Sequence, residues 1–465
     1  MEILRRSPMF GILAALTSGL AFYDRAGAWA FIILAPLIFT GVSFLSYEND
    51  LPGQWQIFFA GLGLVILCSA RIFFVLSMPD KKIPNFYKEI GVISQIRKWG
   101  KNYAAIIETE NYGKLVTRLY FAEYMEGTKI KFDGVARPFK NAKSPGDFDE
   151  KKYWKAHGVE SWVNIRNAEE LSEKFSPALI RYKISYALTI KIPKLTGEYL
   201  KAAWLGQHTE ELDAQHRKWG TSHLLAVSGF HVGLAIMFAE FFFGKNFFCL
   251  SLIMWTYIFL TGMPPSAMRA SLMFQLGLIA PPLFGRKTNG VNIVSVAAVI
   301  LLLFRPFLFW DIGWRLSVIS ALTITMMPRE KYMWLFIGPA VSMTTFPQII
   351  TTFKTMPYAG FIINLFAPFY FSMAFLIASV SVFLALINFP VVNNFLFSVE
   401  GIFLLWERIA DTIADLIPGS MHFNIYTLSL WTGAAIFFAC RYFNFSLRKT
   451  FFIVLSGIFA AYIFS

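Results

Sequence analysis

The charged residues of this chain are concentrated in one segment, and this uneven distribution is the strongest constraint on its fold. Residues 81–222 hold 42 of the 71 Lys, Arg, Asp and Glu residues, and long apolar runs occupy most of the rest. The whole chain is only 15% charged, compared with about 25% for ordinary soluble proteins. Because about 20 apolar residues let a helix cross a bilayer, the sequence predicts a polytopic α-helical membrane protein with a soluble insert.

Three apolar runs precede the insert, at about 8–23, 28–47 and 55–78. Arg5 and Arg6 favour a cytoplasmic N-terminus by the positive-inside rule. Three crossings then predict that the insert is extracytoplasmic. The net charge of +13 fits basic cytoplasmic loops, and it also suits a polyanionic partner.

The first part of the insert alternates apolar and polar residues with the period of a β-strand. It predicts a small all-β, OB-like domain over 81–165, because five short strands and one helix suit a barrel of that type. Such barrels often bind nucleic acid or oligosaccharide, but the fold alone does not fix the ligand. The predicted strands are 89–97, 103–110, 113–121, 128–135 and 159–165, and the predicted helix is 149–157.

Residues 166–222 are predicted to be amphipathic or connecting helices. The stretch 174–194 suits either a helix on the membrane surface or a connector packed on the insert. The remaining domains are N-terminal transmembrane helices over 1–80 and a second transmembrane domain over 223–465. Several of its helices are too short to cross a bilayer alone. They are predicted near 223–243, 247–262, 267–284, 291–304, 313–327, 332–346, 359–388, 397–417, 427–443 and 450–464.

The segment TSHLLAVSGFHVGL (221–234) carries polar groups inside an otherwise apolar region. In lipid such groups cost several kcal/mol each, so they are expected to face protein or a water-filled cavity. Ser228-Gly229 is predicted to break the helix, and Ser222, His223, Ser228, Gly229 and His231 are candidate cavity-lining residues. The alternative is two core histidines with satisfied partners. No metal site is predicted, because no Cys or carboxylate lies nearby.

Two further segments place charge among apolar residues. In LTGMPPSAMRASLM, Ser266 is a plausible N-cap and Arg269 lies one turn into the next helix. Arg269 either snorkels to the headgroups or faces a channel. In RPFLFWDIGWRLSVIS, Asp311 and Arg315 are four residues apart, which suits a structural ion pair or a polar layer of a pore.

Motifs for nucleotide hydrolysis, zinc proteolysis or thiol chemistry are absent from the sequence, so no cofactor and no enzyme activity is predicted. One alternative stays open. Ser228 and His231 are three residues apart, so a serine–histidine hydrolase within the membrane is conceivable, although no third orienting residue can be assigned.

Taken in order, these segments resemble the ComEC family of competence proteins. The resemblance is carried by KSPGDFDEKKYWKAHGV (143–159), by YLKAAWLGQHTEELDAQHRKWGTSHLLAVSGFHVGL (199–234), by the Arg269 and Asp311 segments, and by PYAGFIINLFAPFYFSMAFL (357–376). It implies a channel in the bacterial cytoplasmic (inner) membrane that conducts single-stranded DNA during natural transformation. Many family members continue into a metallo-β-lactamase-like domain. This sequence ends at Ser465 without such a histidine cluster, so a nuclease is expected to be a separate protein or absent.

The resemblance also implies partners, namely single-stranded DNA, membrane lipids, a DNA receptor, a separate nuclease and a cytoplasmic helicase. A net charge of +6 over 81–165 suits weak, salt-dependent DNA binding. Two other functions remain open: transport of another polymer or amphiphile, such as a glycan or lipid-linked intermediate, and the intramembrane hydrolase. The aromatic residues predicted to stack on bases are Tyr103, Tyr112, Tyr120, Trp154 and Trp162.

Overall fold

The fold is described from a computed structural model of the chain. The helices predicted at 427–443 and 450–464, the basic pair Arg5 and Arg6, and Tyr120 lie outside the described residues. The structure describes residues 7–46, 54–79, 86–100, 102–119, 124–140, 142, 148–284, 289–327, 336–386 and 392–422.

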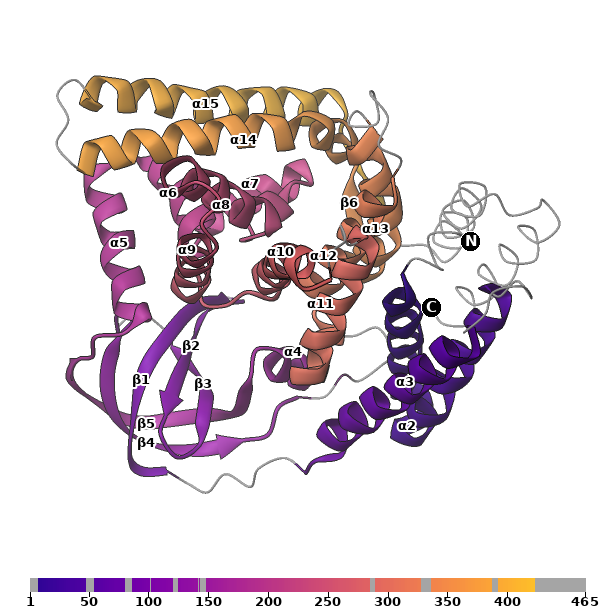
Figure 1. The fold of residues 1–465 in the computed structure, drawn as a ribbon. Helices are drawn as coiled ribbons and strands as arrows, with labels where there is room; N and C mark the ends of the chain where they lie inside the picture. Colours follow the sequence, from indigo (N-terminus) through magenta and orange to yellow (C-terminus); the bar gives the residue numbers. More distant parts are fainter. Residues whose placement is uncertain are drawn as a thin grey trace.

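The first part of the charged segment forms a closed five-stranded barrel with the strand order β1-β2-β3-β5-β4 (Figure 1). All neighbouring strands are antiparallel except β3 and β5, which run parallel. In β4 the side chains alternate between buried and half-buried, as expected for a strand with one face on a core. Each predicted strand is present. The strands are β1 (Phe86–Trp99), β2 (Asn102–Thr109), β3 (Gly113–Leu119), β4 (Thr128–Arg137) and β5 (Val159–Glu173).

The boundary predicted at residue 165 is wrong, because β5 continues to Glu173. Its second half pairs antiparallel with β4, with Thr128 opposite Glu173 and Phe132 opposite Ala168. The sequence of this half is polar, with low strand propensity, and it is mostly exposed. Pairing with β4 overrides that local preference, which is a weak guide in strands. The barrel domain therefore includes residues that the sequence assigned to the helical connector.

The connector consists of three helices, α5 (Pro177–Lys191), α6 (Lys194–Leu205) and α7 (Glu210–Trp219). Figure 1 shows α5 running from the barrel towards α14 and α15. Arg181 of α5 donates from Nε to Glu126 Oε2 at 2.7 Å, and its Nη1 donates to the carbonyl of Leu260 at 3.3 Å. A third bond joins Arg181 Nη2 to the carbonyl of Ser94 in β1. Because this buried arginine ties the barrel to α9, α5 is a connecting helix.

The N-terminal part consists of α2 (Pro8–Ser46) and α3 (Gln54–Ser77). The two apolar runs predicted in α2 are joined, with a kink at Gly27, whose φ of 77° is accessible mainly to glycine. The remaining elements follow the connector. They are η1 (Ser222–Leu224), α8 (Gly229–Phe243), α9 (Phe247–Leu260), α10 (Pro265–Phe284), α11 (Gly290–Phe304), η2 (Pro306–Trp310), α12 (Ile312–Met326), α13 (Ile337–Phe353), β6 (Thr355–Pro357), α14 (Ala359–Leu386), α15 (Val392–Leu416) and β7 (Ser420–His422), with α4 (Glu150–Ala156) between β4 and β5.

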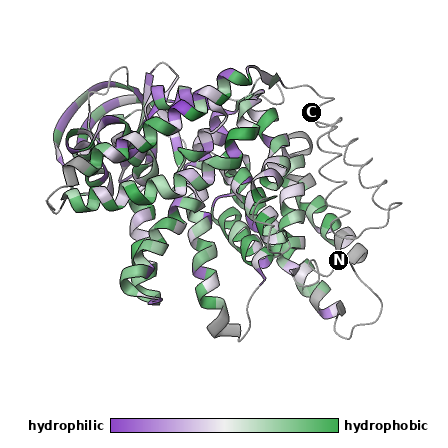
Figure 2. Cartoon of the chain, turned by 90° about the horizontal axis from the view of Figure 1, so that it is seen from above, coloured by the Kyte–Doolittle hydropathy of each residue, from purple (hydrophilic) through white to green (hydrophobic). Residues whose placement is uncertain are grey.

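Three helical stretches in the described part of the chain are long and apolar enough to cross a membrane: Phe58–Ser77, Ser222–Phe243 and Ala359–Ala385. Five shorter apolar helices accompany them. Figure 2 shows the division of polarity, since hydrophilic residues gather on the barrel and the helices are mainly hydrophobic. The number and direction of the crossings stay predictions.

The connector is also anchored to the last described helices. Tyr199 of α6 stacks on Phe403 of α15, with ring centroids 4.5 Å apart. Glu400 of α15 accepts bonds from the backbone N–H groups of Leu195 and Thr196 at 3.0 and 2.8 Å. Its carboxylate therefore caps the start of α6, whose own N-cap residue is a proline without a side-chain acceptor.

Candidate membrane cavity and helix break

The helix break predicted at Ser228-Gly229 is confirmed. A short 3₁₀ turn, η1, contains His223, and α8 begins only at Gly229. Ser228 between them has extended backbone angles. Its N–H donates to Nδ1 of His231 at 3.2 Å, so the histidine satisfies one of the polar groups released by the break. A polar, non-helical stretch of backbone therefore interrupts an apolar region.

Ser266 holds this break in place from a neighbouring helix. Its hydroxyl donates to the carbonyl of Val227 at 2.6 Å. The prediction that Ser266 is an N-cap is wrong, because α10 already begins at Pro265. The early start is favourable, since proline at the first helical position loses no intrahelical bond. Ser266 thereby connects the first turn of α10 to the residue just before Ser228.

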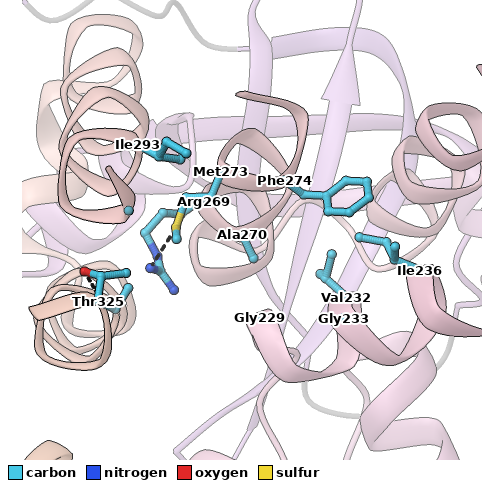
Figure 3. Close-up of a pocket in the computed structure, with 12 residues that line it drawn as sticks. Gly229, Val232, Gly233, Ile236, Arg269, Ala270, Met273, Phe274, Ile293 and Thr325 are labelled. Carbon is cyan, nitrogen blue, oxygen red and sulfur yellow. Dashed lines mark hydrogen bonds between the residues drawn. The ribbon is translucent and has the colours of Figure 1, made fainter. Parts of the chain in front are cut away.

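A cavity of about 420 Å³ lies beside the break, among α8, α10, α11 and α12 (Figure 3). Its walls are mainly apolar, and three of its lining residues are glycines. The lining residues are Gly229, Val232, Gly233, Ile236, Arg269, Ala270, Met273, Phe274, Gly290, Ile293, Ala321 and Thr325.

Arg269 is the charged residue among those that line the cavity. It is 6% exposed. Nη1 lies 3.4 Å from the sulfur of Met273, Nη2 donates to the hydroxyl of Ser317, and Nε is buried without a partner. In the part of the chain that the structure describes, no carboxylate forms an ion pair with Arg269. The guanidinium is therefore a buried cation whose described partners are all neutral.

The glycines of α8 set the distance between this helix and the opposite wall of the cavity. A Cβ added at Gly229 would lie 3.1 Å from Cβ of Ala270 and 3.8 Å from Nη2 of Arg269. The first turn of α8 thus lies directly against the guanidinium. At Gly233 an added Cβ meets no atom within 4 Å, so this side of α8 borders open space.

The other residues predicted around the channel are not among those lining this cavity. Ser222 and His223 are exposed, and His231 is buried next to Phe375, with ring centroids 5.3 Å apart. Asp311 accepts from the N–H of Trp314 at 2.7 Å and so caps α12. The backbone N–H of Arg315 donates to the carbonyl of Asp311 at 3.1 Å, and the two side-chain charges attract each other, while Nε of Arg315 is buried without a partner.

The stacking residues predicted in the barrel need a correction. Trp154 and Trp162 are 0% and 1% exposed, respectively, because they form the buried contact of α4 with the barrel, so they are not surfaces for bases. Tyr112 packs edge-on against Phe86, with centroids 4.9 Å apart, and Tyr103 is half-buried on the barrel core.

A different aromatic cluster is accessible. Phe148, which is 61% exposed, lies next to the half-buried rings of Trp99 and Tyr153 at centroid distances of 5.8 and 5.5 Å. We call these three residues the aromatic cluster. The sequence did not reveal it, because the three rings come from β1, from α4 and from the residue just before the N-cap of α4, and nothing in the local pattern shows that they meet.

Basic residues surround the place where the barrel meets η2. Nη1 of Arg97 lies 3.5 Å from the hydroxyl of Tyr153, and the guanidinium of Arg305 lies beside Gly158. Between them, burial lowers the pKa of His157 to about 3, and the charges of Arg97 and Arg305 contribute to this lowering. Positive charge therefore gathers next to the aromatic cluster.

No group of three or more His, Cys, Asp or Glu side chains that could hold a metal ion occurs among the described residues. Ser228 Oγ lies 3.3 Å from Nδ1 of His231, within reach of a hydrogen bond between a serine and a histidine. However, Nδ1 also accepts the N–H of Ser228, and Nε2 is buried without a partner. Within the described chain, no third residue therefore orients the imidazole as a catalytic base needs.

Apolar helices of membrane-spanning length, an inserted barrel and a buried cation beside a helix break together define a membrane protein with a polar interior site. The chain belongs to the competence protein family, since the family model described as "Competence protein" matches residues 206–450, more than half of its length. This confirms the resemblance to the ComEC family.

Among curated proteins, the chain is similar to ComE operon protein 3 of Bacillus subtilis (strain 168). The two are 27% identical over 237 residues, which cover 47% of this chain and 29% of that protein. The chain thus matches less than a third of that relative's length. No solved structure matches the chain.

Proposed function

We propose that the protein conducts single-stranded DNA across the bacterial cytoplasmic membrane during natural transformation. The observation that carries the proposal is the cavity at Arg269, which combines a buried cation with a broken helix inside an apolar region. A strand with one charge per phosphate needs a path on which that charge is neutralised. Membership of the competence protein family supports the same role.

The barrel would act at the entrance of this path. We propose that it is an OB-type domain on the extracytoplasmic side, where its net positive charge attracts the strand. The aromatic cluster of Trp99, Phe148 and Tyr153 would stack on unpaired bases, and Arg97 and Arg305 would contact phosphates. Because α5 ties the barrel to α9 through Arg181, a strand held on the barrel would stay close to the membrane helices.

The protein would work as a passive path and not as an enzyme. A DNA receptor would deliver the strand, a separate nuclease would degrade its complement, and a cytoplasmic helicase would pull. The transport of another polymer or amphiphile is less well supported, since the residues that line the cavity include one fixed cation and no ring of hydroxyls for a glycan. The Ser228–His231 contact favours a hydrolase by distance alone, and Nε2 of His231 lacks an orienting partner among the described residues.

A transformation assay tests the proposal. A strain that lacks the gene should lose transformants, and the intact chain should restore them. DNA that still binds to the cell surface of the deletion strain but stays accessible to external nuclease would locate the defect at the membrane step. Normal transformation without the protein would reject the proposed function.

A further inference from the structure

We propose that Arg269 and the first turn of α8 form a binding site for one backbone phosphodiester. The inference rests on the proposed function and specifies how the cavity recognises its substrate. In this site the cavity recognises the charge of the DNA backbone and not the bases. The cavity should therefore accept any sequence.

Arg269 is a buried cation whose described partners are all neutral. Moving a guanidinium out of water costs several kcal/mol unless an anion or strong hydrogen bonds compensate. The partners of Arg269 in the structure are a thioether and a hydroxyl, both neutral, and Nε has none. A bound anion would supply the missing compensation.

Two sources of positive potential converge at the cavity, the guanidinium of Arg269 and the N-terminal end of α8. The first N–H groups of a helix have no partners within it, and the helix dipole adds positive charge at that end. The first residue of α8, Gly229, lines the same cavity as Arg269. The position of its missing Cβ is 3.8 Å from Nη2, so an anion at the guanidinium would also lie next to the helix end.

A backbone phosphodiester is the anion whose shape and charge fit this cavity. A phosphodiester has two free oxygens, which match the paired N–H donors of a guanidinium. It carries a single charge, as does Arg269. The other walls offer mostly alkyl, thioether and phenyl groups, which give no pattern of donors and acceptors for reading bases. The volume of about 420 Å³ lies in the range of ligand pockets.

The test uses the full chain in a phosphate-free maltoside detergent, with Cys68, Cys249 and Cys440 replaced by serine. Thr325→Cys then places one thiol on the α12 wall of the cavity (Figure 3). An anionic thiosulfonate should label it about tenfold faster than a cationic one of similar size, because a cationic cleft concentrates anions. In Arg269→Gln this preference should disappear, and in Arg269→Lys most of it should remain.

Ligand protection identifies the occupant. A short oligothymidylate should slow the labelling of the thiol introduced by Thr325→Cys, and the uncharged methylphosphonate oligomer of the same length should not. Equal protection by both would overturn phosphate recognition, and protection by phosphatidylglycerol but not by the oligothymidylate would assign the site to a lipid phosphate. Equal labelling by the two reagents in the protein that retains Arg269 would overturn the site itself. The labelling preference is measured without uptake, so a failure of the proposed function would leave it intact.

The protection experiment on the protein that retains Arg269 does not depend on whether Arg269→Gln folds. If that variant does not purify as a folded protein, the protection experiment on the protein with Arg269 decides. Protection by the charged oligomer that vanishes in about 1 M salt supports the site, because screening weakens phosphate contacts. Protection that is insensitive to salt, or no protection at all, rejects it.

Discussion

Removal of the Arg181 side chain should weaken the attachment of the barrel to α9 and destabilise the protein. The side chains of Arg181 and Glu126 are 3% and 5% exposed, respectively. In Arg181→Met the carboxylate of Glu126 would keep only neutral donors, the N–H of Ile96 at 2.9 Å and the amide of Gln207 at 3.2 Å. Breaking a buried ion pair from one side costs about 3–5 kcal/mol.

The double variant Arg181→Met/Glu126→Gln is the matched control. It removes the unpaired charge at position 126 and keeps an oxygen that accepts the N–H of Ile96. The free energy of unfolding should therefore recover by at least about 2 kcal/mol relative to Arg181→Met. Urea unfolding of the purified protein, followed by its tryptophan fluorescence, measures all variants. An unchanged midpoint in Arg181→Met would refute the reasoning. So would additive losses in the double variant, since they would mean that the two side chains do not interact.

Three further predictions follow from the cavity and the barrel. Gly233→Phe should fill the open side of the cavity and abolish transformation. Gly63→Phe, at another glycine that faces open space, should leave transformation unchanged. Equal loss of transformation in the two strains, at equal amounts of protein in the membrane, would contradict the role of the cavity. The partly buried His157 stays neutral in the fold, where its pKa is about 3. In the unfolded chain it takes up a proton below about pH 6.5. The free energy of unfolding should therefore be about 2 kcal/mol lower at pH 5 than above about pH 6.5. His157→Gln should flatten this dependence in urea titrations at pH 7 and 5, and an unchanged slope would disprove the assignment. Trp99→Ala should weaken oligothymidylate binding to the full chain by about 1–3 kcal/mol in a fluorescence titration, and unchanged affinity would exclude the aromatic cluster.

The barrel was largely predictable, since apolar residues recur along each of the five strands. In β4 they alternate with polar ones, whereas the middle of β2 is buried on both faces, against the barrel core and against α4. The second half of β5 was not predictable, since its exposed polar residues are held in the sheet by β4 and not by their own propensity. The break between the two apolar runs was predictable, and the structure has it at the non-helical Gly27, which separates the two halves of α2.

The sequence predicted the helix break at the candidate site, but not which helices pack around it. Ser228-Gly229 predicted the break because both residues tolerate or favour a helix end. Which helices surround the break depends on tertiary packing, so spacing alone did not separate Arg269, which lines the cavity, from Asp311, which caps α12. The burial of Trp154 could not be predicted from the sequence either, since tryptophan is common both in cores and on binding surfaces.

The central claim is that a single strand of DNA passes the cavity beside Arg269. Phe274 lines that cavity, and Phe369 lies on an exposed, apolar side of α14. A photo-reactive benzoylphenylalanine at position 274, in cells that still transform, should cross-link incoming labelled DNA, and the same residue at position 369 should not. The cross-linked DNA should be sensitive to a nuclease specific for single strands. Normal transformation without a cross-link at position 274, or equal cross-linking at the two positions, would contradict the account.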